Sequence, residues 1–296
     1  MIRSPKLLTP ALTTIAMVAA LVAPVAASTG VSRVVQLGDS YSAGYGVLDE
    51  DRGGAGGDCL EEGFFDSSAV PGGRLASALD VPLEFLACGG AEIEDVVDQF
   101  HEARPSIPGD GTGTVVVFTA GGNDVRSIRG EMWTDVLTRC IIWDFSCERR
   151  SANQLGNLDE VASEMGALVE MIATSAPRAQ VRVLGYPELF QRSPFCFGVT
   201  GIDRNEASFL DGLASELNNA LEDAVNEVAA DRDVDISWVD VEHAFDDHGA
   251  CQTERSGERY VNDTEFVPRS FRVQLNSFHP TTSGYDAYSA ALNASL

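Results

Sequence analysis

Residues 34–40 read VVQLGDS, an apolar strand pattern that ends in a turn. Gly38 interrupts the apolar run, and Ser40 follows two residues later. A serine at the carboxyl end of a buried strand, on a backbone bent by glycine, has an exposed hydroxyl group and an amide that faces a crevice. The stretch predicts a serine presented as a nucleophile, and a turn that merely closes the strand is the simpler alternative.

Three further motifs stand beside predicted elements: CGGA at 88–91, GGND at 121–124 and SFHP at 277–280. The first two follow apolar runs, and the third precedes a helical pattern over 282–291. In this order, and together with the GDS motif, they resemble the SGNH hydrolases, also called GDSL-like lipases and esterases. The resemblance covers the chain from Val34 to its C-terminus. It implies a serine hydrolase that acts on carboxylic esters.

Short apolar runs alternate with helical patterns along the whole chain. Apolar residues recur at helical spacing over 155–172 and 210–228, which predicts core-facing helices. Such alternation indicates an α/β fold in which helices cover both faces of a parallel sheet. With the resemblance, we expect a three-layer α/β/α sandwich of SGNH or flavodoxin-like type, with a central, mainly parallel five-stranded sheet. The predicted strands are 32–37, 81–86, 114–119, 180–185 and 234–239.

The first residues have the pattern of an export signal. Residues 7–27 are mostly apolar, follow two cations and end in small side chains. This predicts a signal peptide over residues 1–27. A membrane anchor is the alternative, but two prolines and several threonines leave only a short uninterrupted apolar core. We expect residues 28–296 to form a single SGNH hydrolase domain that is secreted, extracellular and not inserted in a membrane.

The chain is strongly acidic, with 20 Lys and Arg residues against 45 Asp and Glu residues. Residues 1–27 hold two of the cations and no acid, so the net charge falls from −25 to −27 after cleavage. Nucleic acid and anionic membrane surfaces would be repelled by this charge. A neutral ester substrate, whether a small molecule or a lipid, is favoured. Nothing in the sequence calls for more than a monomer.

All six cysteines follow the predicted signal peptide, so disulfides are expected rather than free thiols. No Cys-x-x-Cys pair occurs, which disfavours a zinc site, and no metal or organic cofactor is expected. Six cysteines allow 15 pairings, which the sequence does not decide. The family resemblance implies consecutive pairing, namely Cys59 with Cys88, Cys140 with Cys147, and Cys196 with Cys251.

A serine hydroxyl is a poor nucleophile unless a base lies within hydrogen-bonding reach, so Ser40 requires a histidine. The chain has four, and the patterns around His101, His243 and His248 indicate surface or loop packing. His279 precedes a proline, which keeps it out of helical geometry at a loop-to-helix junction. A surface histidine before a proline is the alternative. The resemblance assigns His279 the role of general base.

Acyl transfer also needs donors where negative charge develops on the carbonyl oxygen. The resemblance assigns this oxyanion hole to the backbone amides of Ser40 and Gly90 and the side-chain amide of Asn123. Glycine lets a backbone N–H approach a ligand closely, and asparagine donates without carrying a charge. The alternatives are a glycine kept for a turn and an asparagine that caps a following helix.

The sequence departs from the family pattern at two positions. Many members have an acidic residue three positions before the histidine, whereas this chain has Asn276. We expect a Ser-His dyad in which a backbone carbonyl, such as that of Asn276, accepts the imidazole N–H. Gly89 stands where secreted relatives often carry serine. This second departure should matter less, because the donor is assigned to Gly90.

Together these features predict a secreted serine esterase or lipase that hydrolyses acyl glycerols or similar lipid esters. A short-acyl carbohydrate or small-ester deacetylase is the alternative within enzymes, and an inactive binding protein on the same scaffold is the alternative of another class. The acyl-chain preference is not predicted. Aromatic residues that could line an acyl site or simply fill the core are Phe195, Phe197 and Phe271, and the segments 185–190 and 245–251 look structural or wall-forming.

Overall fold

The computed structural model describes residues 30–47, 68–142, 147–190, 202–250, 258–263 and 276–296. Five strands form one sheet in the order β2-β1-β3-β4-β5, and every neighbouring pair is parallel. The predicted five-stranded α/β fold is therefore confirmed. The strands are β1 Arg33–Gln36, β2 Leu83–Phe85, β3 Thr114–Phe118, β4 Gln180–Leu184 and β5 Asp235–Val239.

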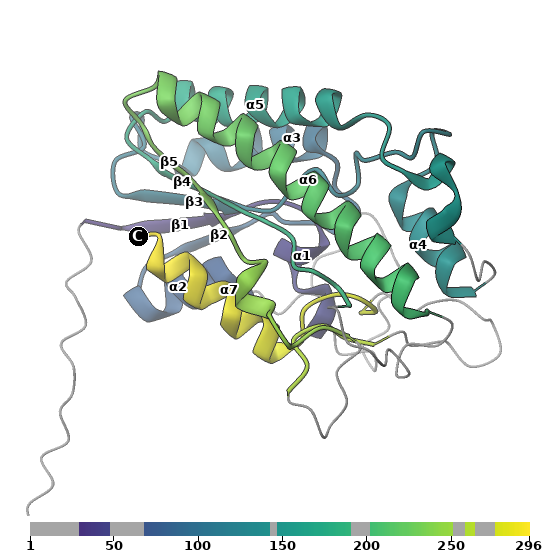
Figure 1. Ribbon diagram of the computed structural model, residues 1–296. Coiled ribbons are helices and arrows are strands. Elements are labelled where there is room, and N and C mark those ends of the chain that lie inside the picture. Colours follow the sequence, from purple (N-terminus) through teal and green to yellow (C-terminus); the bar gives the residue numbers. More distant parts are fainter. Residues whose placement is uncertain (1–29, 48–67, 143–146, 191–201, 251–257, 264–275) are drawn as a thin grey trace, which may run out of the picture.

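The central strands are largely buried and mostly apolar because helices cover both faces of the sheet. All five residues of β3 are buried, and so are the last four of β4. On one face lie α3 (Ile93–Ala103), α5 (Leu158–Ser175) and α6 (Arg204–Asp231), and on the other lie α2 (Pro71–Leu79) and α7 (Thr282–Ala294) (Figure 1). These layers make the expected α/β/α sandwich.

Two further helices, α1 (Ser40–Ala43) and α4 (Trp133–Ile142), lie outside these layers. The four-residue helix α1 directly follows β1, and α4 stands beyond the carboxyl ends of the strands, near the first turns of α6 (Figure 1). Residues of α4 pack with residues of α6 in one apolar cluster. The short 3-10 helices are η1 Tyr45–Val47, η3 Arg104–Ser106, η4 Cys147–Arg149, η5 Ser151–Asn153 and η6 His243–Phe245.

Helix α6 is longer than the apolar stripe that predicted it. It begins at Arg204 because Asp203 and Glu206 form a capping box, in which each side chain accepts the other residue's backbone N–H. The predicted apolar stripe starts only at Leu210, so the stripe alone missed residues 204–209 of the helix. Among the described residues, every helix is too short or too polar to cross a membrane.

Strand order fixes where the molecule can hold a ligand. Strand β1 pairs with β2 on one side and with β3 on the other, and the chain leaves β1 to build the sheet in both directions. At such a switch point the loops after the two neighbouring strands separate and leave a crevice at their carboxyl ends. Gln36 aligns with Phe85 and with Val117, so the residues after all three strands meet at one edge.

One predicted disulfide is present among the described residues. Cys140, in α4, is bonded to Cys147, in η4, with 5.4 Å between their Cα atoms. Cys88 is also disulfide-bonded. Its expected partner Cys59, and the expected pair Cys196 and Cys251, lie outside the described residues.

Candidate active site

Ser40 is the first residue of α1 and stands at the carboxyl end of β1, as the sequence predicted. The turn before it requires glycine. Gly38 has a φ of 111°, and a Cβ atom at this position would lie 2.3 Å from the carbonyl oxygen of Thr119. Asp39 then caps α1, because its side chain accepts the backbone N–H of Tyr41 at 3.0 Å.

His279 reaches Ser40 from the other end of the chain. Its Nε2 atom lies 2.7 Å from Ser40 Oγ, which is hydrogen-bonding distance. Phe278 has a φ of 63°, and its carbonyl oxygen accepts the Tyr41 hydroxyl at 2.8 Å. Asn262 Nδ2 donates to the carbonyl oxygen of His279 at 3.1 Å. The loop that carries the histidine is thus held by α1 on one side and by residues 258–263 on the other.

The carbonyl beside the imidazole is that of Ser277, and the expectation of Asn276 is wrong. His279 Nδ1 lies 3.0 Å from Ser277 O, whereas Asn276 O accepts the backbone N–H of His279 in a turn. A carbonyl can only accept, so Nδ1 carries the proton and Nε2 is left with a lone pair for the Ser40 hydroxyl. This tautomer is the one that a general base requires.

The expected oxyanion donors face the same cavity as the serine and the histidine. Ser40, Gly90, Asn123 and His279 all line it. Gly90 has a φ of 82°, and nothing lies within 4 Å of the place where a Cβ atom would be, so the space beside this residue is open. Asn123 Nδ2 donates to Ala91 O at 2.9 Å, which leaves its second N–H for a ligand. No described helix begins at Asn123, so it does not act as a helix cap.

The departure at Gly89 has a steric explanation. A Cβ atom on Gly89 would lie 1.9 Å from the ring of Tyr45, so this ring occupies the space that a side chain would need. The Tyr45 ring in turn packs beside His279, with 5.6 Å between the ring centroids. Glycine at position 89 therefore makes room for an aromatic wall next to the proposed base.

The cavity extends from Ser40 between α4 and α6 and has a volume of about 350 Å³. Apart from the polar groups described above, the walls of this cavity are mostly apolar. This size is typical of a small-molecule site, and apolar walls suit a hydrocarbon chain. The apolar and aromatic side chains that line it are Tyr41, Tyr45, Val125, Trp133, Leu137, Leu155, Tyr186, Pro187, Leu189, Leu213, Ala214, Leu217 and Phe278.

A family model described as the GDSL-like lipase/acylhydrolase family matches residues 37–287. The chain belongs to this family. The match contains all four motifs on which the resemblance to the SGNH hydrolases was based. This GDSL-like acylhydrolase is accordingly a carboxylic ester hydrolase of the lipase and esterase type.

Characterised relatives of this acylhydrolase are called lipases. The chain is 29% identical to a lipase of Streptomyces rimosus over 293 residues, which are 97% of this chain and 94% of the relative. It is also 29% identical to lipase 2 of Streptomyces coelicolor over 265 residues, 84% of this chain and 81% of the relative.

Solved structures show the same fold. Phospholipase A1 from Streptomyces albidoflavus aligns with a TM-score of 0.69 and 24% identity, over 90% of this chain and 100% of that one. The extracellular lipase from Streptomyces rimosus aligns with a TM-score of 0.66 and 23% identity, over the same shares.

Behind Ser40 lies a buried polar network that sequence reasoning missed. The Asp39 carboxylate accepts the hydroxyl groups of Thr119 and Tyr186, each at 2.5 Å. The Tyr186 hydroxyl also accepts the backbone N–H of Gly122 at 2.9 Å. Burial raises the pKa of Asp39, and its hydrogen bonds to Thr119, Tyr186 and nearby backbone oppose that rise. The network connects the turn that carries Ser40 to the Gly122-Asn123 turn and to the end of β4.

The motif GYP at 185–187 gave the only sequence signal for this network, since it follows the fourth strand as the other motifs follow theirs. Tyr186 and Pro187 also line the cavity, so the wall-forming interpretation is confirmed for both. Phe245 is fully buried against Tyr260 and Tyr288, and is therefore structural. Three aromatic candidates, Phe195, Phe197 and Phe271, lie outside the described residues.

The remaining histidines lie outside the cavity lining. His101 is exposed, and His243 is exposed beside Asp246. His248 stacks on Tyr260 with 3.9 Å between the ring centroids. The expectation of surface or loop packing is confirmed for all three.

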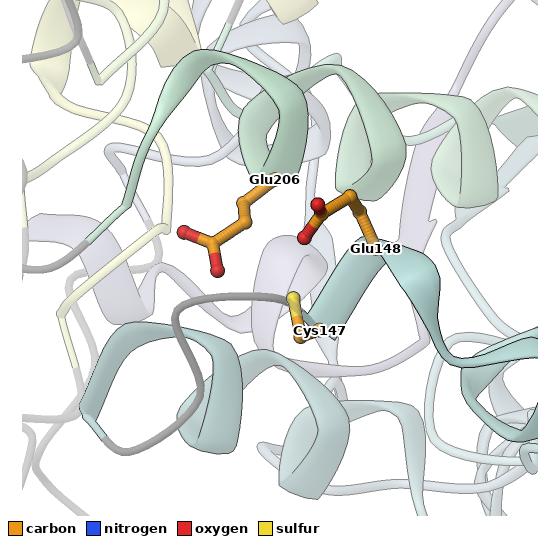
Figure 2. A group of neighbouring side chains, drawn as sticks. All are labelled: Cys147, Glu148 and Glu206. Atoms are coloured by element: carbon orange, nitrogen blue, oxygen red, sulfur yellow. The ribbon is translucent and has the colours of Figure 1, made fainter.

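One cluster of potential metal ligands lies near α4, where Cys147, Glu148 and Glu206 converge (Figure 2). The sulfur of Cys147 is bonded to Cys140, so no thiolate is available there. Two carboxylates remain, and burial raises the pKa of Glu206. Among the described residues, Glu148 Oε2 and Glu206 Oε1 have no hydrogen-bond partner. The cluster is therefore a pair of neighbouring carboxyl groups and not a metal site with a cysteine ligand.

Proposed function

We propose that this protein is a secreted lipase that hydrolyses neutral acyl esters with a Ser40-His279 dyad. One observation carries the proposal: His279 Nε2 lies 2.7 Å from Ser40 Oγ while Nδ1 faces a backbone carbonyl, at the mouth of an apolar cavity. This arrangement can activate the serine without a carboxylate. The reaction requires no metal or organic cofactor.

Ser40 Oγ forms a bond to the ester carbonyl carbon while His279 Nε2 takes its proton. The negative charge moves to the carbonyl oxygen, where the amides of Ser40 and Gly90 and the side chain of Asn123 donate to it. The intermediate then expels the alcohol, which takes the proton back from His279. Water attacks the acyl-enzyme by the same route, which releases the acid and restores Ser40.

The cavity favours a lipid ester over an acetylated carbohydrate. Trp133 and Leu137 from α4 face Leu213 and Leu217 from α6 across it, and such walls would bind an acyl chain. A sugar would require more polar partners than these walls supply. The charge of the chain, −25, supports a neutral rather than an anionic substrate and disfavours nucleic acid.

The proposal includes export and processing. Residues 1–27 are the proposed signal peptide, and residues 28–296 are the proposed mature enzyme, a monomer of one domain that is not inserted in a membrane. Support comes from the Cys140–Cys147 disulfide, which is typical of oxidising compartments, and from the extracellular lipase of Streptomyces rimosus. Mass spectrometry of secreted protein tests it, and a mature N-terminus far from Ala27 would contradict it.

Hydrolysis of p-nitrophenyl esters from acetate to palmitate tests the substrate. We expect maximal turnover at medium or long chains, and Ser40→Ala should lower kcat by about four orders of magnitude or more. Ala214→Phe narrows the cavity and should move the maximum toward shorter chains, whereas the exposed change Glu216→Gln on the same helix should not. A maximum at acetate would favour a small-ester deacetylase, and turnover independent of Ser40 would contradict the nucleophile.

A further inference from the structure

The two proposed oxyanion donors outside the nucleophile turn stand on different loops. Gly90 follows β2 and precedes α3, whereas Asn123 follows β3. Both must point at one oxygen atom with donor distances of about 2.7 to 3.1 Å. The sheet aligns the strands, but each loop extends several residues beyond its strand. Something must fix the two loops to each other.

Three side chains cross the gap between these loops. Asn123 itself donates to Ala91 O at 2.9 Å. The carboxylate of Asp124 accepts the backbone N–H of Ile93, with its two oxygens at 3.0 and 3.2 Å. Arg126 Nη2 pairs with Glu92 Oε1 at 2.7 Å. Each contact joins a residue of the 123–126 segment to a residue of the 91–93 segment.

Arg126 also acts on its own loop. Its Nη1 atom donates to the carbonyl oxygen of Asn123, so one guanidinium bridges the residue that carries the proposed donor and the residue that caps α3. Ile93 is the first residue of α3, an eleven-residue helix, and its amide is one of those that lack a partner within the helix. Asp124 supplies that partner, and its negative charge suits the helix N-terminus.

We propose that Asp124 and Arg126 are positioning residues that lock the Gly90 and Asn123 loops into one oxyanion hole. The inference rests on the proposed function, because it assumes that these two residues hold the oxyanion. Neither positioning residue needs to touch the substrate. Their effect is on the transition state, where both donors must be aligned at once, so it should appear in kcat more than in KM.

The lock should also depend on pH. Burial raises the pKa of Asp124 to about 6, and the negative charges of Glu92 and Glu164 add to this rise. The hydrogen bond from the Ile93 N–H and the positive charge of Arg126 act in the opposite direction. Above pH 6 the carboxylate is charged and accepts from Ile93. As the pH falls through 6 it gains a proton, and its hold on the helix end weakens. The part of the activity that depends on this contact should fall through the same pH range.

The experiment compares wild type, Asp124→Ala and Asp124→Asn on a soluble p-nitrophenyl ester. At pH 8 we expect Asp124→Ala to lower kcat by about 10-fold to 100-fold and to change KM by less than about 3-fold. This loss is smaller than that caused by removing an oxyanion donor, because the donors are misaligned but still present. Asp124→Asn keeps an acceptor oxygen and should lose less. Because protonated Asp124 resembles asparagine, the advantage of wild type over Asp124→Asn in kcat/KM at pH 8 should disappear as the pH falls through 6.

Asp98→Asn, on the exposed face of α3, is the matched control and should behave as wild type in both kcat and pH profile. Thermal unfolding of each variant shows that it is folded, and if Asp124→Ala does not fold, the kcat of Asp124→Asn at pH 8 still decides. Wild-type kcat in the folded variants at pH 8 would overturn the proposal, and an advantage of wild type over Asp124→Asn that persists below pH 6 would overturn its pH dependence. An unchanged kcat in Asn123→Ala would instead overturn the proposed oxyanion hole itself.

Discussion

The acidic side chains of Asp39 and Glu206 are both withdrawn from water, and their surroundings differ sharply. Asp39, directly before Ser40, accepts hydrogen bonds from two hydroxyl groups and a backbone amide. Glu206, at the start of α6, accepts the backbone N–H of Asp203 but faces a second carboxylate, that of Glu148 (Figure 2). Burial raises the pKa of both acids.

The difference shows what a buried acid can contribute. The donors around Asp39 come from the ends of β1, β3 and β4, so its carboxylate joins three strands beneath the proposed nucleophile. At Glu206 one oxygen serves the capping box and the other has no donor within the described residues. We therefore expect Asp39 to stabilise the site and the Glu148-Glu206 pair to cost stability near neutral pH.

Asp39→Ala should cause the largest change in stability among the variants of these two acids. It leaves Thr119 Oγ1, Tyr186 Oη and the Tyr41 amide without their acceptor, and each buried donor without a partner costs about 1 to 3 kcal/mol. We expect the free energy of unfolding, measured in urea, to fall by at least about 3 kcal/mol. The exposed change Asp98→Ala is the control. A loss below about 1 kcal/mol would mean that these donors find other partners.

Tyr186→Phe should have a smaller effect on stability and a clear effect on turnover. The missing hydroxyl leaves Asp39 Oδ2 and the Gly122 amide each short of one partner, at a cost of about 1 to 3 kcal/mol. Because Gly122 precedes Asn123, we expect kcat to fall more than KM rises. Tyr288→Phe removes a buried hydroxyl that donates to Gly185 O at 2.8 Å, and should lose stability without this loss of kcat. Equal kcat in the two variants would contradict a positioning role for Tyr186.

Glu206→Gln should give the smallest change in stability, and this change should be an increase. Glutamine can keep the capping box and can donate to Glu148. A raised pKa means that the folded state binds protons more tightly than the unfolded chain, so wild type loses stability as the pH rises above about 4.5 and through the raised pKa.

The Glu206→Gln variant does not lose stability in this way as the pH rises. Its melting temperature at pH 8 should exceed that of wild type by up to about 4 °C, with no gain at pH 4. Calorimetry at the two pH values measures this, and Glu216→Gln, exposed on the same helix, is the control. A lower melting temperature of Glu206→Gln at pH 8 would show that the second acid stabilises the fold.

The sequence predicted those parts of the molecule that depend on local pattern. The five strands were predicted because each is a short apolar run. Ser40, Gly90 and Asn123 were expected at one edge of the sheet because each follows such a run, and all three line the same cavity. His279 was selected because the chemistry requires a base and the chain has few histidines, and it lies in hydrogen-bonding contact with Ser40.

The parts that were missed depend on contacts between distant segments. Tyr186 meets Asp39 across 147 positions of sequence, and no local pattern encodes that contact. The cavity walls depend on how α4 and α6 pack, which follows from tertiary structure alone. Whether the carbonyl of Asn276 or that of Ser277 faces the imidazole depends on the backbone path of this loop, in which Phe278 has a positive φ, and the sequence does not encode that path locally.

That last feature bears on how this active site can change over evolutionary time. In a catalytic triad, a single substitution of the acidic residue removes the partner of the histidine. Here the partner is the carbonyl oxygen of Ser277, and every amino acid supplies such an oxygen. Mutation at position 277 alters the side chain but cannot delete the acceptor. Because the path of the main chain orients His279, this orientation can persist in related proteins whose side chain at position 277 is different.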